Sequence, residues 1–156
     1  MPHGPSAIKV VGMLLALGVC LMDAGVTGAG DRKVLRPRVP PAQLEAARKI
    51  HNPLPATRAL IEQGKTLYHG KAFCVTCHGG DGKGLGPGVN PKLAQGALPR
   101  DFTDRAWQAA RTDGELLWIL QNGSPGTAMA SFIPLVITEE EAWQLILYMR
   151  SFGGSQ

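Results

Sequence analysis

Cysteine is scarce in this chain of 156 residues, which holds only Cys20, Cys74 and Cys77. A structural zinc site usually takes four ligands from two paired motifs, and the sequence has a single CxxC pair. Sustained alternation of apolar and polar residues is missing as well, so no β-strand is predicted. No apolar run reaches the roughly 20 residues that span a bilayer. These absences leave an all-α chain with long loops.

The net charge of +4 belongs to one segment and not to the chain as a whole. Residues 30–56 hold six basic and two acidic side chains, whereas residues 57–156 hold nine of each. A nucleic-acid-binding protein would need a basic patch on its folded domain, so we expect no nucleic acid as a partner. The Pro/Arg-rich extension 30–56 is interpreted as a solvated or membrane-proximal arm that wraps the domain or links it to something else.

The N-terminus carries a short uncharged run. Lys9 precedes thirteen apolar or small residues, Val10 to Met22, which fit the hydrophobic region of a secretory signal. Small residues at Thr27-Gly28-Ala29 offer a cleavage site. We therefore predict a signal peptide over residues 1–29 and export to the periplasm. An uncleaved anchor, which would associate the protein with the membrane, is the alternative.

The residues Cys74-Val75-Thr76-Cys77-His78 form the attachment signature of a c-type haem. Two thiols at this spacing can form thioethers to the vinyl groups on one edge of a porphyrin, and the imidazole that follows can bind iron beneath the ring. A thioredoxin-like redox pair would follow a strand, and none is predicted here. A disulfide between Cys74 and Cys77 would close a small, strained loop. His69 lies too close in sequence to complete a zinc site, so one covalent haem c is predicted.

Helical periodicity organises the domain that we assign to residues 57–153. Apolar residues at spacings of three and four predict a first helix from Thr57 to Gly70. Gly64 lies within its apolar stripe, which indicates a close approach of another backbone, best supplied by the last helix. That last helix begins with the capping box Thr138-x-x-Glu141 and ends at Gly153. Shorter helices are predicted over Ala42–Ile50, Thr103–Ala110 and Asp113–Asn122.

A haem iron bound by one histidine has a second axial position, and four residues are candidates to fill it. Met129 lies in a loop after a helix, from which its thioether can reach iron. Met149 lies on an apolar helical stripe, where core packing is the better interpretation. His69 is too near the attachment motif to cross to the other face, and His51 lies in the proline-rich arm. We predict axial ligation by His78 and Met129.

The order of helix, CxxCH motif, glycine-rich loop, internal helices, loop methionine and closing helix resembles the class I cytochromes c. The resemblance covers roughly residues 57–152 and implies the cytochrome c fold, with three to five helices and long loops wrapped around one covalently bound haem. It implies that Gly64, Tyr68 and Tyr148 lie where the first and last helices cross. It also implies that the carbonyl of Pro87 accepts a hydrogen bond from His78 and orients the ring.

Two further stretches, Pro99–Asp104 and Asp113–Trp118, resemble a bacterial monohaem subgroup of that family. The methionine of this subgroup is usually followed by proline, whereas Ala130 follows Met129 here. The resemblance implies a periplasmic one-electron carrier of a respiratory chain, which cycles between Fe(III) and Fe(II) and exchanges electrons with redox partner proteins.

Two filled axial positions leave no open site on the iron, so no enzymatic activity is expected. Two alternatives stay open. The chain could be a haem-bearing subunit of a larger respiratory oxidoreductase complex. If Met129 does not bind iron, a haem sensor or peroxidase-like protein is the other alternative.

Overall fold

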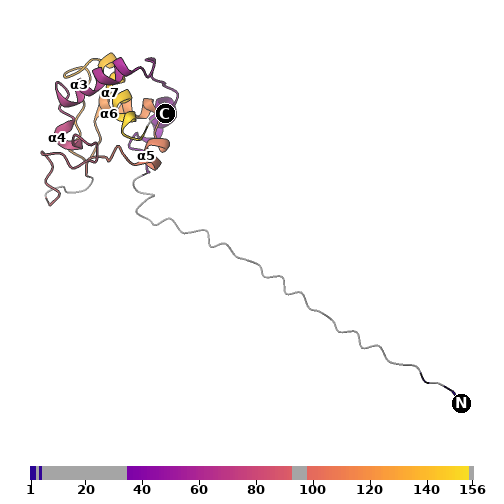
Figure 1. The fold of residues 1–156 in the computed structure, drawn as a ribbon. Coiled ribbons are helices and arrows are strands. Elements are labelled where there is room, and N and C mark those ends of the chain that lie inside the picture. Colours follow the sequence, from indigo (N-terminus) through magenta and orange to yellow (C-terminus); the bar gives the residue numbers. More distant parts are fainter. Residues whose placement is uncertain (3, 5–34, 93–97, 155–156) are drawn as a thin grey trace.

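The structure, a computed structural model, describes residues 1–2, 4, 35–92 and 98–154. The described residues form helices α2 (Pro41–Arg48), α3 (Arg58–His69), α4 (Val75–His78), α5 (Arg105–Ala110), α6 (Asp113–Asn122) and α7 (Glu139–Ser151). These helices gather in one body with long connecting loops (Figure 1). No strand occurs among these residues, and the predicted all-α class is confirmed. Most of the predicted signal peptide, 1–29, lies outside the described residues, and none of the described helices is long and apolar enough to cross a membrane.

Side-chain caps fix where the predicted helices begin. The hydroxyl of Thr57 accepts a hydrogen bond of 3.3 Å from the backbone N–H of Leu60 at the start of α3. Helices α6 and α7 both open with reciprocal capping boxes, in which the N-cap threonine and the glutamate three residues later satisfy each other's backbone N–H. These boundaries agree with the sequence prediction. The additional helix is α4, a single turn that covers most of the CxxCH motif.

Helices α3 and α7 pack against each other, and Figure 1 shows them side by side. Gly64 is buried in their contact, and a Cβ atom there would collide with the backbone carbonyl of Gln144 on α7. The Tyr68 and Tyr148 rings meet edge to face beside it, with centroids 5.2 Å apart. The predicted crossing at Gly64 is therefore present, and the absence of a side chain lets the two backbones approach.

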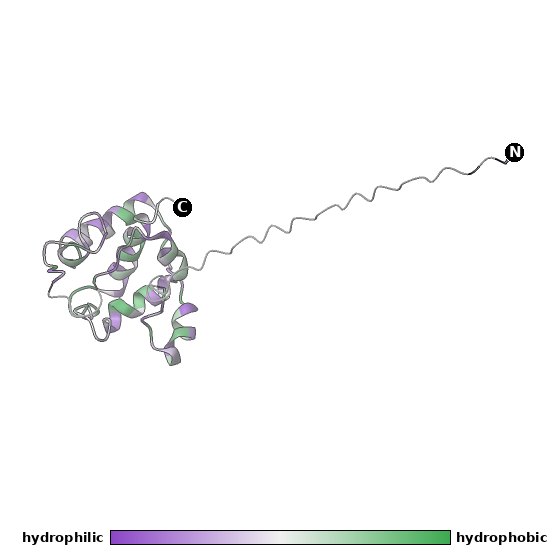
Figure 2. Ribbon diagram, turned by 90° about the horizontal axis from the view of Figure 1, so that it is seen from below, coloured by the Kyte–Doolittle hydropathy of each residue, from purple (hydrophilic) through white to green (hydrophobic). Residues whose placement is uncertain are grey.

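The core is built mainly from α6 and α7. Figure 2 shows hydrophobic and hydrophilic residues side by side on the helices of the body. Its buried side chains are Tyr68, Ala72, Phe102, Trp107, Leu116, Leu117, Leu120, Ile137, Ala142, Trp143, Leu145, Ile146, Tyr148 and Met149. Burying each large apolar side chain contributes roughly 1.5–3 kcal/mol to folding. The cluster thus gives the loops around the CxxCH motif a rigid support.

The described part of the N-terminal extension packs against this body. Ala47 of α2 is only 3% exposed, and a Cβ at Gly114 on α6 would collide with its carbonyl oxygen. The Trp118 indole N–H donates to the side-chain oxygen of Gln43 at 2.6 Å. The side-chain amide of Asn52 donates to the carbonyl of Trp143 at 3.1 Å. The described part of the extension therefore lies against α6 and α7.

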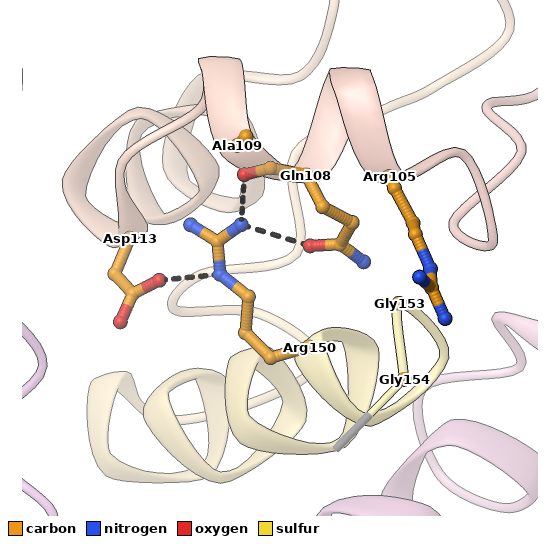
Figure 3. Close-up of a pocket in the computed structure, with 7 residues that line it drawn as sticks. All are labelled: Arg105, Gln108, Ala109, Asp113, Arg150, Gly153 and Gly154. Carbon is orange, nitrogen blue, oxygen red and sulfur yellow. Dashed lines mark hydrogen bonds and ion pairs between the residues drawn. The ribbon is translucent and has the colours of Figure 1, made fainter. Parts of the chain in front are cut away.

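Arg150 joins the C-terminal end of α7 to α5 and α6, as Figure 3 shows. Its Nε donates to the Asp113 carboxylate at 2.7 Å, and its Nη1 donates to the backbone and side-chain oxygens of Gln108, both at 2.8 Å. Its Nη2 donates to the carbonyl of Arg111 at 2.6 Å. A surface pocket beside this cluster is lined by Arg105, Gln108, Ala109, Asp113, Arg150, Gly153 and Gly154, none of which belongs to the CxxCH motif.

Candidate haem site

The helical turn α4 places both cysteines and the histidine of the motif on one short element. Residues three and four apart lie on the same face of a helix, so Cys77 and His78 follow Cys74 at the two spacings that bring side chains together. The backbone N–H of His78 donates to the carbonyl of Cys74 at 2.8 Å and closes the turn. Phe73 precedes it with φ 51°, a left-handed conformation that bulky residues rarely adopt. Such strain is characteristic of functional segments held by their surroundings.

The His78 imidazole is fixed from two sides. Its Nδ1 lies 3.1 Å from the carbonyl oxygen of Arg100, and its ring stacks on Phe102 with centroids 4.4 Å apart and planes 17° apart. The prediction that Pro87 supplies this carbonyl is therefore corrected: Arg100 occupies the role. The stretch Pro99–Asp104 gives no sequence signal for this role, because the acceptor is a backbone atom that any residue type can supply.

Backbone contacts with the glycine-rich loop hold the Arg100 carbonyl in place. The N–H of Phe102 donates to the carbonyl of Gly82 at 2.7 Å, and the N–H of Gly84 donates to the carbonyl of His78 at 2.9 Å. Gly84 has φ +81°, and a Cβ atom there would collide with the carbonyl oxygen of Pro99. The loop and the segment around Arg100 thus cross in direct backbone contact next to His78.

Burial sets the protonation of the motif's titratable groups. Desolvation lowers the pKa of His78 below its usual value, although the bond to the Arg100 carbonyl works in the opposite direction. A neutral imidazole that donates through Nδ1 has its lone pair on Nε2, the form in which histidine binds a metal. Desolvation also raises the pKa of the Cys74 thiol to about 12, so this thiol is protonated at neutral pH.

Met129 lies in a closed turn between α6 and α7. Its backbone N–H donates to the Thr127 hydroxyl at 3.2 Å, and its carbonyl accepts from the N–H of Ser124 at 2.8 Å. The Met129 side chain is half-buried and packs against the same apolar core as Cys74. Ligation of iron by Met129 stays a prediction.

The other candidates for the second axial position have different surroundings. Met149 is 8% exposed and belongs to the core cluster, as its helical spacing indicated. His51 and His69 are exposed, and His69 Nε2 lies 3.4 Å from the hydroxyl of Tyr148. Among the described residues, no three His, Cys, Asp or Glu side chains gather as a zinc centre would require.

The residues present fit a covalent haem. Cys74 and Cys77 are both free thiols on one turn, and the His78 tautomer set by the Arg100 carbonyl leaves Nε2 for iron. Four large apolar side chains are exposed at positions close in sequence to the CxxCH motif, the glycine-rich loop, Arg100 and Met129. Exposed apolar surface is unfavourable in water, and an apolar cofactor that covered these side chains would remove that cost. Their exposed fractions are 69% for Phe73, 63% for Leu85, 46% for Leu98 and 90% for Leu135.

Comparison with known proteins agrees with this geometry. The family model of cytochrome c matches residues 61–153, more than half of the chain, and the chain belongs to the cytochrome c family. Covalently bound haem c and haem-based electron transfer follow from that membership. Bound haem supplies an iron that gains and loses one electron. Cys74 and Cys77 would hold the haem through their thiols, and the Arg100 carbonyl orients the His78 ring whose Nε2 would bind the iron.

Two solved structures are similar to this chain. A chain of the reducing HAO-like protein complex Kustc0457/Kustc0458 of Kuenenia stuttgartiensis is 30% identical, with a TM-score of 0.56, over 64% of this chain and 46% of that chain. This chain therefore spans about half of that protein's length. The c-type cytochrome KustC0563 is 35% identical, with a TM-score of 0.45, over 57% of this chain and 95% of that chain. No curated protein matches the chain.

Proposed function

We propose that this chain is a periplasmic monohaem cytochrome c that carries one electron at a time between redox partner proteins, with His78 and Met129 as axial ligands. The observation that carries the proposal is the His78 ring, which donates through Nδ1 to the Arg100 carbonyl beside two free thiols on the same turn. That bond raises the basicity of the imidazole as a ligand. A soft thioether on the other face favours Fe(II) and tends to raise the reduction potential.

Electron transfer without catalysis is the chemistry that two filled axial positions support. Iron with both positions occupied has no site for a peroxide or a gas, so the proposed protein is a carrier and not an enzyme. Export to the periplasm is supported by the uncharged run from Val10 to Met22, which has the length of a secretory signal. A single CxxCH motif in the sequence supports one haem per chain.

The optical spectrum of the oxidised protein tests the axial ligand. Met129→Ala is expected to abolish the weak far-red charge-transfer band that a thioether bound to ferric iron gives. Met149→Leu is the matched control, because it replaces a buried core methionine by an apolar residue of similar volume and keeps that band. A high-spin spectrum in the unmodified protein, or the band's persistence in Met129→Ala, would contradict the ligand assignment.

A second function is favoured by the similarity to a chain of the Kuenenia stuttgartiensis complex. In this alternative the chain is a haem-bearing subunit within a larger oxidoreductase complex and transfers electrons inside it. Size-exclusion chromatography of native extract, followed at the haem absorbance, separates the two functions. A free carrier elutes near its own mass of 16.6 kDa, or slightly below it after signal cleavage, whereas a subunit elutes with a much larger assembly.

A further inference from the structure

The side-chain amide of Gln108 joins α5 to α7 and to the segment that precedes α5. Its Nε2 donates to the carbonyl of Phe102 at 2.8 Å and to the carbonyl of Met149 at 2.9 Å. Its Oε1 accepts from Nη1 of Arg150 at 2.8 Å, and Figure 3 shows this oxygen facing the guanidinium. Both N–H groups and the oxygen of the amide are therefore used, which gives the amide a single orientation.

The Gln108 side chain is also closely packed where α7 ends. A Cβ atom at Gly153 would lie 3.0 Å from Cγ and 3.3 Å from Cδ of Gln108. The missing side chain of Gly153 thus makes room for the amide to reach the carbonyl of Met149. Breaking such hydrogen bonds in a partly buried position leaves acceptors unsatisfied, which costs free energy. Gln108 therefore ties the backbone at Phe102 to α7.

Phe102, whose carbonyl Gln108 binds, contacts the histidine of the haem site directly. Phe102 is 4% exposed, and its ring stacks on the His78 ring with centroids 4.4 Å apart and planes 17° apart. The Trp107 ring also packs on Phe102, with centroids 5.7 Å apart. The backbone N–H of Phe102 donates to the carbonyl of Gly82 at 2.7 Å. The backbone of Phe102 is therefore held through its N–H by Gly82 and through its carbonyl by Gln108.

The segment from Arg100 to Phe102 supplies both contacts of the His78 ring. The Arg100 carbonyl oxygen lies 3.1 Å from Nδ1, and the Phe102 ring covers one face of the imidazole. An imidazole with a hydrogen bond at one edge and a ring stacked on one face cannot turn about its bond to a metal without losing one of these contacts. Whatever holds this segment therefore sets the angle of the His78 plane.

We propose that Gln108 is a positioning residue of the haem site, which fixes the angle of the His78 plane through Phe102. This inference rests on one part of the proposed function, the ligation of iron by His78, and is independent of Met129. A ligand held at one angle in both oxidation states does not have to turn when an electron arrives or leaves. Gln108 thus acts on the redox centre from α5, through the backbone of its neighbour.

Proton NMR of the haem-loaded ferric protein with cyanide bound tests the proposal. Cyanide in excess replaces the ligand on the other side of the iron and is symmetric about its axis, so the shifts of the haem methyl groups then report the angle of the His78 plane. Gln108→Met is expected to change the order or the spread of these shifts, because methionine has a similar length but no donor for the Phe102 carbonyl.

Redox titration without cyanide gives a second measure of the same change. A looser segment weakens the hydrogen bond between His78 Nδ1 and the Arg100 carbonyl, and a less basic imidazole stabilises Fe(III) less. In Gln108→Met the ratio of reduced to oxidised protein at a fixed potential should therefore rise roughly threefold, which corresponds to the partial loss of one hydrogen bond.

Arg150→Lys is the matched control, because it disturbs the other end of the same amide. It removes hydrogen bonds of the guanidinium, whereas both Nε2 bonds of Gln108 stay in place. Its unfolding midpoint should fall, and its methyl shifts should stay those of the wild type. Gln108→Glu is the complementary variant, since it keeps an acceptor for Arg150 and loses both donors. It should reproduce the shift pattern of Gln108→Met and replaces that variant if Gln108→Met attaches no haem.

The results that would overturn the proposal are distinguishable. Unchanged methyl shifts in both Gln108 variants would show that Phe102 holds its place without the amide. Equal changes in Arg150→Lys would show a general loosening of the domain. Loss of covalent haem from both Gln108 variants, but not from the wild type, would show that Gln108 acts on folding alone. A wild-type spectrum without the shifted ring protons of an iron-bound histidine would overturn ligation by His78, and with it the proposed function.

Discussion

At the residue scale, the orientation of His78 depends on a neighbouring glycine. Gly84 contacts the segment that supplies the Arg100 carbonyl, with hypothetical Cβ distances of 3.0 Å to the Pro99 carbonyl carbon and 3.2 Å to that of Arg100. Its φ of +81° is also a conformation that side chains disfavour. A single missing side chain thus permits the crossing on which the hydrogen bond of His78 depends.

Gly84→Ala should displace this segment and weaken the bond between His78 Nδ1 and the Arg100 carbonyl. Backbone strain and overpacking together should cost about 3 kcal/mol of unfolding free energy. A less basic imidazole stabilises Fe(III) less, so the reduction potential should rise. Denaturant unfolding and redox titration measure the two effects.

Gly154→Ala is the control for backbone strain alone. Gly154 has φ +89°, and the nearest atom to an added Cβ is the flexible end of Arg105 at 3.3 Å. We expect a smaller loss of stability in this variant and no change of potential. A potential that stays constant in Gly84→Ala would refute the positioning role of the crossing, even if stability fell.

At the element scale, α5, α6 and α7 are joined by the single guanidinium of Arg150. Its fork satisfies an aspartate and three further oxygens at distances between 2.6 and 2.8 Å, and its side chain is 17% exposed. A lysine cannot reproduce this planar arrangement, because its ammonium is a point charge with different directions of donation. We therefore expect that only an arginine at position 150 can hold the ends of these three helices together.

Arg150→Lys should lower the unfolding free energy by about 2 kcal/mol, since at least two of the four acceptors lose their donor in a partly buried position. Urea denaturation, followed by far-UV circular dichroism, measures the loss. Arg105→Lys is the matched control, because Arg105 is exposed on the other side of the same pocket and should change stability by less than about 0.5 kcal/mol. Equal losses in the two variants would contradict the joining role.

At the scale of the whole molecule, local signals predicted the helices well, whereas the contacts of the haem site depend on tertiary structure. Threonine caps and apolar periodicity are encoded within one helix, so α3, α6 and α7 could be located from the sequence. The turn α4 was missed because four residues are too few to show a periodicity. The Arg100 carbonyl was missed because any residue type can supply one, so only the fold shows which carbonyl meets His78.

The extension also shows this limit, because its prolines and charges suggest an arm, whereas its described residues bury Val39 and Ala47. A chain that begins at Thr57 would lose the buried side chain of Val39, 4% exposed, and that of Ala47, 3% exposed. It would also leave Gly114 and the Trp118 indole without their partners from the extension.

We expect this truncation to lower the unfolding free energy of the haem-loaded protein by at least about 2 kcal/mol. A chain that begins at Leu35 should retain the full value, and guanidinium unfolding followed at the haem absorbance compares the two. Coincident unfolding midpoints would show that the extension contributes nothing to the stability of the domain.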